Sequence, residues 1–209
     1  MKNHCLVLLT SADSSNLYDR HKLGFADQQR IQEFPQLAQR LDWQNSRFLK
    51  QQLPSDYSYT SLTHKKGCAA LIASTSCCPL GIDLEYVQQR DFLALSTLCC
   101  SEVEQEWLTQ QQDLATSFYQ LWTLKEALIK AHHGQLSDLC KWSLIQPAKS
   151  SIHIPTLQLQ AYTAVIKQSW FLSVVYPAIY TDVTKCTQIF GAWNKHDIIW
   201  HRWPNHPSV

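Results

Sequence analysis

The stretch Gly81-Ile82-Asp83-Leu84-Glu85 decides how this chain folds around its candidate site. Apolar residues alternate here with small or acidic ones, and strict alternation is typical of a half-buried β-strand. Residues two apart in a strand share a face, so Asp83 and Glu85 are expected to project side by side, away from the apolar face. Two adjacent carboxylates repel each other unless a cation lies between them, and Mg²⁺ commonly takes one or two carboxylates with water and substrate phosphates. The plainer interpretation is an exposed edge strand with two solvated acids, which the short motif alone favours.

A second stretch, Trp122-Thr123-Leu124-Lys125-Glu126, lies in a segment without Gly or Pro, residues 117–132, for which the pattern predicts a helix. Apolar residues recur there at intervals of three and four, and Gly134 follows where a left-handed cap residue is expected. Glu126 and Lys130 are four apart and therefore share one face. Taken alone, they are best interpreted as an ordinary surface ion pair, which contributes roughly 0.2–0.5 kcal/mol.

Together the two stretches resemble the paired signature of 4′-phosphopantetheinyl transferases, in the Sfp-like group. The motifs are G-I-D-L-E at residues 81–85 and W-T-L-K-E-A-L-I-K at residues 122–130. A third element, S-L-T-H at residues 61–64, is similar to the family's S-x-S-H and precedes both. Each motif is weak alone, but their order and spacing agree with the family over about residues 61–134.

The chain also departs from the family pattern. Thr63 replaces the second Ser of S-x-S-H and keeps a hydroxyl, while Lys65 and Lys66 stand where small polar residues are usual. The two lysines could meet an acidic carrier protein, although a solvated loop is the simpler interpretation. The family's F-[ST]-x-x-E is here C-S-E-V-E at residues 100–104, without the aromatic. We interpret Glu104 as the acid of a capping box that begins at Ser101, rather than as a metal ligand.

The resemblance implies transfer of the 4′-phosphopantetheine arm of coenzyme A to a serine of an apo acyl or peptidyl carrier protein, with release of 3′,5′-ADP. This is the reaction of a holo-[acyl-carrier-protein] synthase. Mg²⁺ on Asp83, Glu85 and Glu126 would screen the pyrophosphate. Lys130 would stabilise the leaving group, and either Glu126 or a water on the metal ion would take the serine proton.

The resemblance also implies ligands for coenzyme A. His64 would donate to a phosphate, with the 3′-phosphate preferred, and the N-terminal region of the family supplies basic residues for the same group. The candidates carried over to this chain are His64, Thr63, Lys125 and Lys130, with Arg40, Arg47 and Lys50 from the N-terminal region. The simpler alternatives are a buried or loop histidine at residue 64 and solvated helix charges at Arg47 and Lys50.

Two rival functions remain open from the sequence. One is a different Mg²⁺-dependent phosphoryl or nucleotidyl transferase, against which the lack of a Gly-rich phosphate loop counts. The other is a family-shaped protein that binds coenzyme A or a carrier protein without turnover, against which the intact acids and Lys130 count.

Composition limits the partners of the chain. Among the 209 residues, 45% are hydrophobic and 17% are charged, and the net charge of +1 provides no global field for nucleic acid or membrane. Any anion site must therefore be local. No targeting segment is visible, because the apolar run at residues 5–9 is far too short for a signal or a span. We expect a cytoplasmic monomer whose eight cysteines are mostly small buried hydrophobes.

The predicted fold class is α+β. The resemblance implies two similar α+β halves packed as a pseudo-dimer, each with a small antiparallel sheet and helices, and we place the halves at residues 1–105 and 106–209. The alternation patterns predict strands at residues 4–10 and 68–74, the latter in a hairpin with the acidic strand, and helices within 23–50, with Asp42 as an N-cap. Further helices are expected at 92–98 and 101–111, and strands at 142–145, 152–154, 157–166 and 170–175.

Overall fold

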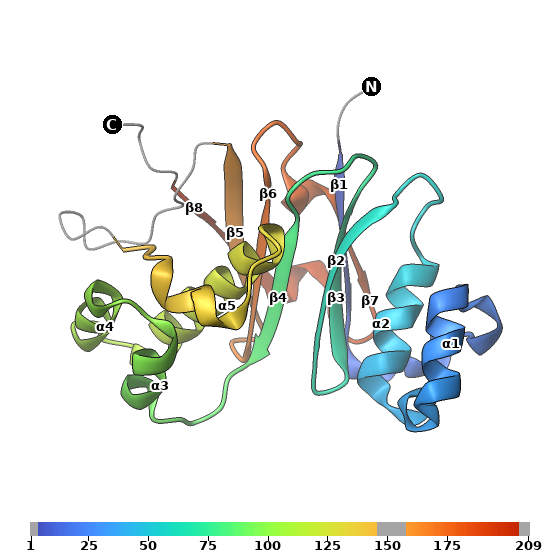
Figure 1. The fold of residues 1–209 in the computed structure, drawn as a ribbon, viewed down its shortest axis with the longest axis horizontal. Helices are drawn as coiled ribbons and strands as arrows, with labels where there is room; N and C mark the ends of the chain where they lie inside the picture. Colours follow the sequence, from blue (N-terminus) through green and yellow to red (C-terminus); the bar gives the residue numbers. More distant parts are fainter. Residues whose placement is uncertain (1–3, 146–157, 205–209) are drawn as a thin grey trace.

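The computed structural model describes residues 4–145 and 158–204. It shows two four-stranded sheets in the middle of the molecule, with α1 and α2 at one end and α3, α4 and α5 at the other (Figure 1). The predicted α+β class is confirmed, whereas the similarity of two halves stays a prediction.

The first sheet has the strand order β2-β3-β1-β7. Its centre is apolar on both faces, because every residue of β1 and of β3 is buried. β1 pairs antiparallel with β3 and parallel with β7, which returns from the far end of the chain. The bounds are Cys5–Thr10 for β1, Tyr59–Lys65 for β2, Cys68–Ser74 for β3 and Thr187–Phe190 for β7.

The second sheet has the order β4-β6-β5-β8, and all its pairs are antiparallel. β4 is an edge strand in this sheet, and β2 of the first sheet packs beside it. The two sheets therefore meet along β2 and β4, which lie next to each other in Figure 1. The bounds are Gly81–Tyr86 for β4, Leu159–Ile166 for β5, Trp170–Pro177 for β6 and Ile198–Trp203 for β8.

The helices cover the outer faces of the two sheets. α2 packs on β3, and α5 packs on β4 and β6. Buried apolar side chains fill each interface, which is the main source of stability in such layers. The bounds are Phe25–Glu33 for α1, Leu41–Gln51 for α2, Phe92–Cys99 for α3, Glu102–Thr109 for α4 and Leu114–Ala131 for α5.

Several predicted elements are confirmed at their expected places. The N-terminal strand, the helices near residues 92–98 and 101–111 and the long helix that carries Glu126 all form. Ser101 and Glu104 form the predicted capping box of α4. Pro35 stands at the first position of a short 3-10 helix at Pro35–Gln39, so it begins a new segment after α1.

Four local predictions are wrong. β3 and β4 form no hairpin, because the chain crosses at residues 75–80 from the first sheet to the second. The N-cap of α2 is Arg40, and Asp42 is the second residue of the helix, within its first turn. The left-handed residue after α5 is His133, with φ of 54°, while Gly134 donates its N–H to Ile129.

The fourth wrong prediction is the strand at residues 142–145. A 3-10 helix at Leu136–Lys141 precedes this segment, which is largely irregular, and the strand predicted at 152–154 lies outside the described residues. The predicted strands at 157–166 and 170–175 form as β5 and β6. The tryptophan-rich tail joins the second sheet as β8, on the far side from β4.

The sheets divide the chain differently from a boundary at residue 105. β4 precedes that position but pairs with β6, whereas β7 follows it but pairs with β1. Each sheet therefore contains strands from both sides of residue 105. Neither sheet is formed only by residues 1–105 or only by residues 106–209.

The cysteines are all free thiols, and half of them follow the prediction of buried small hydrophobes. Cys5, Cys68, Cys99 and Cys100 are buried, whereas Cys77 and Cys140 are exposed. Within residues 4–145 and 158–204, no helix has both the length and the apolar character needed to cross a bilayer.

Candidate functional site

The acidic strand β4 is more deeply buried than its sequence pattern predicts. Asp83 is only 3% exposed, since α5 packs on β4. Glu85, two residues on, is half-buried at the end of the strand. The plainer interpretation of two solvated acids on an exposed edge is therefore wrong for this strand.

Lys130 joins the acids of β4 to the helix α5. Its Nζ donates to Asp83 Oδ1 at 2.7 Å and to the carbonyl oxygen of Ile82 at 3.1 Å. The same Nζ lies 3.9 Å from Glu126, one turn earlier on the helix. Glu126 and Lys130 are thus more than an ordinary surface pair, because they face the acidic strand from the next element.

The strand β2 approaches the same acids from the first sheet. Thr63 Oγ1 donates to Asp83 Oδ1 at 3.1 Å. Lys65 Nζ lies 2.9 Å from Oε1 and 2.7 Å from Oε2 of Glu85. The site therefore draws on both sheets and on α5, at the junction where β2 and β4 meet.

Negative charge is in excess at this junction. Burial, together with the charges of Asp83 and Glu85, raises the pKa of Glu126 to about 8, against the opposing effect of Lys130. Burial and the charge of Asp83 also raise the pKa of Glu85, although Lys65 opposes this. Raised pKa values in neighbouring carboxyls show that each would be stabilised by an added positive charge.

The donor set suits a hard divalent cation. Asp83 Oδ2 is buried and has no hydrogen-bond partner among the described residues, which is costly for a carboxylate oxygen. With Glu85 and Glu126 it offers the oxygen ligands that Mg²⁺ takes. In the described part of the chain, however, no three acidic, histidine or cysteine side chains are already gathered as a metal cluster. Lysine ammonium groups are paired with Asp83 and Glu85 instead.

His64 lies in a mixed-charge setting on β2. Its Nδ1 is 3.8 Å from Asp42, and its side chain is 42% exposed. Partial burial lowers the pKa of His64, and the charges of Arg40 and Arg47 lower it further, while Asp42 opposes them. The ring can donate one hydrogen bond to an anion, in a setting that also feels the charges of Arg40 and Arg47.

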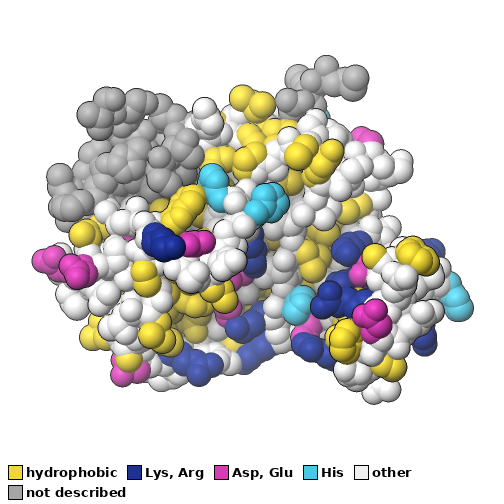
Figure 2. Space-filling model, viewed as in Figure 1, with side chains coloured by type: hydrophobic (Ala, Val, Ile, Leu, Met, Phe, Trp, Pro, Cys, Tyr) yellow, Lys and Arg dark blue, Asp and Glu magenta, His cyan; other side chains and the backbone are white. Residues whose placement is uncertain are grey.

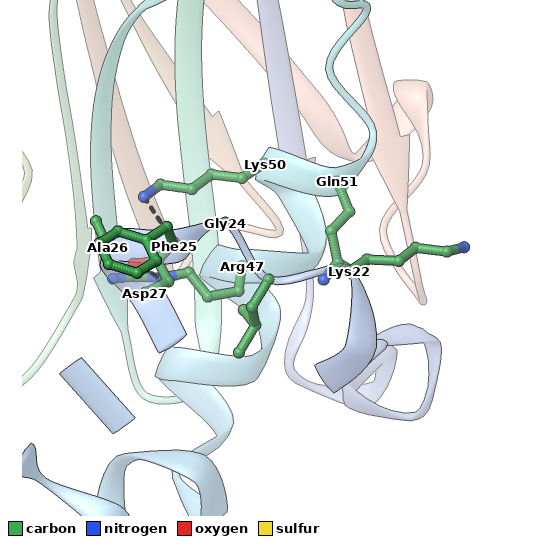
Figure 3. Close-up of a pocket in the computed structure, with 9 residues that line it drawn as sticks. Lys22, Gly24, Phe25, Ala26, Asp27, Arg47, Lys50 and Gln51 are labelled. Atoms are coloured by element: carbon green, nitrogen blue, oxygen red, sulfur yellow. Dashed lines mark hydrogen bonds and ion pairs between the residues drawn. The ribbon is translucent and has the colours of Figure 1, made fainter. Parts of the chain in front are cut away.

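Arg47 and Lys50 line a cavity of about 430 Å³ between α1 and α2 (Figure 3). Both pair with Asp27, at 2.9 and 3.1 Å, and the Arg47 guanidinium also lies 3.7 Å from the centre of the Trp43 ring. Figure 3 shows Lys50 reaching over Asp27. Because one acid already neutralises part of their charge, these two cations are weaker candidates for a phosphate than the sequence suggested.

Lys125 does not join the acid site. Its side chain is 1% exposed and forms an ion pair with Glu104, which also accepts hydrogen bonds from the backbone of Ser101 and Leu144. A lysine enclosed in this way holds α4 and α5 together and does not reach a ligand. The helical pattern carried the signal, since Lys125 falls in the same stripe as Leu121 and Ile129, which are buried.

A smaller cavity beside the acids has no signal in the sequence patterns. It measures about 200 Å³, and Glu85, Lys65 and Trp122 are among the residues that line it. Trp122 lies one turn before Glu126, so the helix face that carries Glu126 and Lys130 extends into this cavity. The cavity gives the acid site an apolar neighbour.

Positive side chains gather on this side of the molecule despite the net charge of only +1. Figure 2 shows Lys and Arg side chains collected in the lower middle of the face, with acidic groups and a histidine among them. The expectation of a local anion site is consistent with this distribution. The fold and these residues define the site as a candidate for binding a divalent cation and phosphate groups.

Comparison with known proteins specifies this class further. Residues 79–178 match the model of the 4′-phosphopantetheinyl transferase superfamily, a segment that includes β4, α5 and β6. A Haemophilus influenzae (strain ATCC 51907 / DSM 11121 / KW20 / Rd) protein named "Putative 4'-phosphopantetheinyl transferase" is 38% identical over 123 residues, 57% of this chain and 48% of that protein. The match thus covers about half the length of this relative. Both findings confirm the superfamily resemblance that the sequence motifs indicate.

Proposed function

We propose that the chain is a phosphopantetheinyl transferase of the Sfp-like group. It moves the 4′-phosphopantetheine arm of coenzyme A to a serine hydroxyl of an apo acyl or peptidyl carrier protein. The observation that carries this proposal is the convergence of Asp83, Glu85, Glu126 and Lys130 within the segment that matches the superfamily. Mg²⁺ is the cation whose ligand preference the three carboxylates fit.

The reaction replaces one phosphorus–oxygen bond by another. The serine oxygen attacks the β-phosphorus of the coenzyme A pyrophosphate, the bond to the bridging oxygen breaks, and 3′,5′-ADP leaves with that oxygen. Mg²⁺ bound at the three acids would supply charge neutralisation for the pyrophosphate. Lys130 would hold its ammonium against the phosphates, since such fixed positive groups act where negative charge develops.

Glu126 is the candidate for the serine proton. It lies on α5 one turn before Lys130, on the helix face that meets the acidic strand. Its half-buried position at the acid site places it close to the expected phosphates. His64, which feels the charges of Arg40 and Arg47, would bind the 3′-phosphate as a hydrogen-bond donor.

The test is a mass measurement on the acceptor. A panel of apo carrier proteins from fatty-acid, polyketide and peptide-synthetase systems is incubated with the protein, coenzyme A and Mg²⁺. Transfer adds about 340 Da, the mass of the phosphopantetheine arm attached to serine. Asp83→Ala should abolish this addition, while a surface variant such as Asp138→Ala should retain it.

Other outcomes assign the site to its rivals. Coenzyme A binding by calorimetry without any mass addition across the panel would favour a binding protein. Release of a phosphoryl or nucleotidyl product without modification of a carrier protein would favour another Mg²⁺-dependent transferase.

A further inference from the structure

Side chains of β2 in the first sheet pair with the acidic side chains of β4 at the same spacing. Thr63 and Lys65 are two apart on β2, and their partners Asp83 and Glu85 are two apart on β4. Lys66 continues the contact, with its Nζ 4.0 Å from the centre of the Tyr86 ring. Two consecutive lysines therefore reach the edge of the second sheet, but only the first meets a carboxylate.

The backbone of the turn next to these lysines is held in place by side chains of α2. Lys66 and Gly67 have positive φ values of 46° and 80°, which define a tight turn between β2 and β3. Asn45 donates to the carbonyl oxygen of Gly67 at 2.6 Å, and Asp42 accepts from its N–H at 3.2 Å. The backbone is thus anchored to α2, and the long side chain of Lys65 provides the freedom of movement.

Lys65 occupies the position on Glu85 that a metal ion would need. Its ammonium lies within 3 Å of both carboxylate oxygens. The Lys65 side chain is also 40% exposed, so that packing does not hold the ammonium in place. A divalent cation that takes the Glu85 oxygens must displace it, and the displaced group stays tethered beside the site.

We propose that Lys65 is a built-in counter-ion of the candidate cation site, which pairs with Glu85 until a divalent cation displaces it and then binds a phosphate oxygen of coenzyme A. This role rests on the proposed function. A lysine suits such an exchange because its ammonium is a compact charge on a flexible stem. The displaced charge moves toward the pyrophosphate, which brings fresh negative charge to the same junction.

The test compares two neighbouring lysines. Mn²⁺ binding to the purified full chain, without coenzyme A, is measured by isothermal calorimetry for the wild type, Lys65→Met and Lys66→Met. Removing the charge next to Glu85 should tighten Mn²⁺ binding on the order of tenfold, because one competing ammonium is lost. Lys66→Met removes the same charge from the adjacent position and should leave the affinity unchanged.

A second titration tests what happens to the displaced ammonium. With Mn²⁺ saturating, coenzyme A should bind several-fold more weakly to Lys65→Met than to the wild type, and with equal affinity to Lys66→Met. Lys65→Gln serves as a second variant, and circular dichroism checks that each variant is folded. The same direction of change in both Lys65 variants would support the exchange.

The opposite results overturn the inference in a recognisable way. If Lys65→Met binds Mn²⁺ no more tightly than the wild type, or if Lys66→Met tightens binding equally, Lys65 is no specific counter-ion. If the variants give either result while the wild type modifies a carrier protein, this inference alone is overturned. A wild type that neither binds Mn²⁺ nor modifies any carrier protein would overturn the proposed function with it.

Discussion

Gly81 of β4 lies directly against the backbone of α5 at Ala127. A Cβ added at Gly81 would overlap the carbonyl oxygen of Ala127 and press on the N–H of Ala131. The close approach brings the helix within reach of Asp83, two residues further along the strand. The glycine of the G-I-D-L-E motif is therefore what allows the acids of β4 and α5 to meet.

We expect Gly81→Ala to destabilise the fold and to reduce transfer. The added methyl group forces α5 away from β4, and overpacking of this kind costs about 1–3 kcal/mol. Chemical denaturation measures the loss. Gly24→Ala is the control, because a Cβ at Gly24 meets no atom within 4 Å. An unchanged stability of Gly81→Ala would show that strand and helix separate at no cost.

The pH dependence of stability should report on Glu126. Its pKa in the folded chain, about 8, lies above the ordinary value of 4.5, so the folded state holds this proton more tightly than the unfolded state does. The resulting stabilisation is complete below about pH 4.5 and is lost as pH rises through about 8. In the absence of divalent cations, Tm should therefore fall between pH 5 and 8. Glu126→Gln should flatten this part of the curve.

Two further results bear on the pH prediction. Glu85 contributes in the same direction, since its pKa is also raised, so Glu126→Gln leaves a smaller slope rather than none. Saturating Mg²⁺ should flatten the wild-type curve too, because the cation favours the ionised carboxylates. Identical slopes in the wild type and Glu126→Gln would contradict the raised pKa.

Lys130→Met should lower turnover by about 10²–10³, and the loss should persist at saturating Mg²⁺. The methionine keeps the stem but removes the charge that faces the expected phosphates, and loss of one such contact has this magnitude. Steady-state kinetics across a Mg²⁺ titration provides the measurement. Lys141→Met removes a lysine from an exposed surface pair with Asp138 and should leave turnover unchanged. Near-wild-type turnover in Lys130→Met would refute its phosphate role.

His64→Ala should discriminate between two forms of the substrate. If the ring binds the 3′-phosphate, the apparent constant for coenzyme A rises more than that for dephospho-coenzyme A. His196→Ala, in the 3-10 helix at Lys195–Asp197, is the control and should change neither constant. Equal losses with both substrates would show that His64 acts elsewhere in the site or only in packing.

Lys125→Met should damage the fold, in contrast to Lys130→Met. It leaves the carboxylate of Glu104 buried without its cation, and breaking a buried pair in this way costs about 3–5 kcal/mol. Denaturant titration gives the free energy of unfolding. Lys50→Met, at a partly exposed pair with Asp27, should cost at most about 1 kcal/mol. A small loss at Lys125 would mean that the Glu104 interaction is not what holds α4 to α5.

The elements of the site were predictable because each has a local signal. Alternation along β4 and the helical period of α5 depend only on neighbouring residues. Their contact was predictable only through the motifs, since neither pattern shows what packs on the other. The burial of Asp83 was missed for the same reason, because alternation identifies an apolar face but says nothing about a helix that covers the opposite one.

The long-range pairings could not be predicted from local patterns. A short connection between β3 and β4 suggested a hairpin, yet the chain crosses between sheets there. The pairing of β1 with β7 joins segments from opposite ends of the chain through only four residues of β7. Likewise, no pattern shows that Lys65 reaches Glu85, since that contact exists only once the two sheets meet.

The exchange of strands between the sheets has a consequence for the order in which the newly made protein can fold on the ribosome. β7 follows most of the chain but completes the sheet that contains β1, and β8 then completes the other. Until residues 187–203 have emerged, β1 lacks its partner β7 and β5 lacks its partner β8, so each of these strands keeps one unpaired edge during synthesis. These two unpaired edges are where the growing chain can pair with another chain until β7 and β8 have been made.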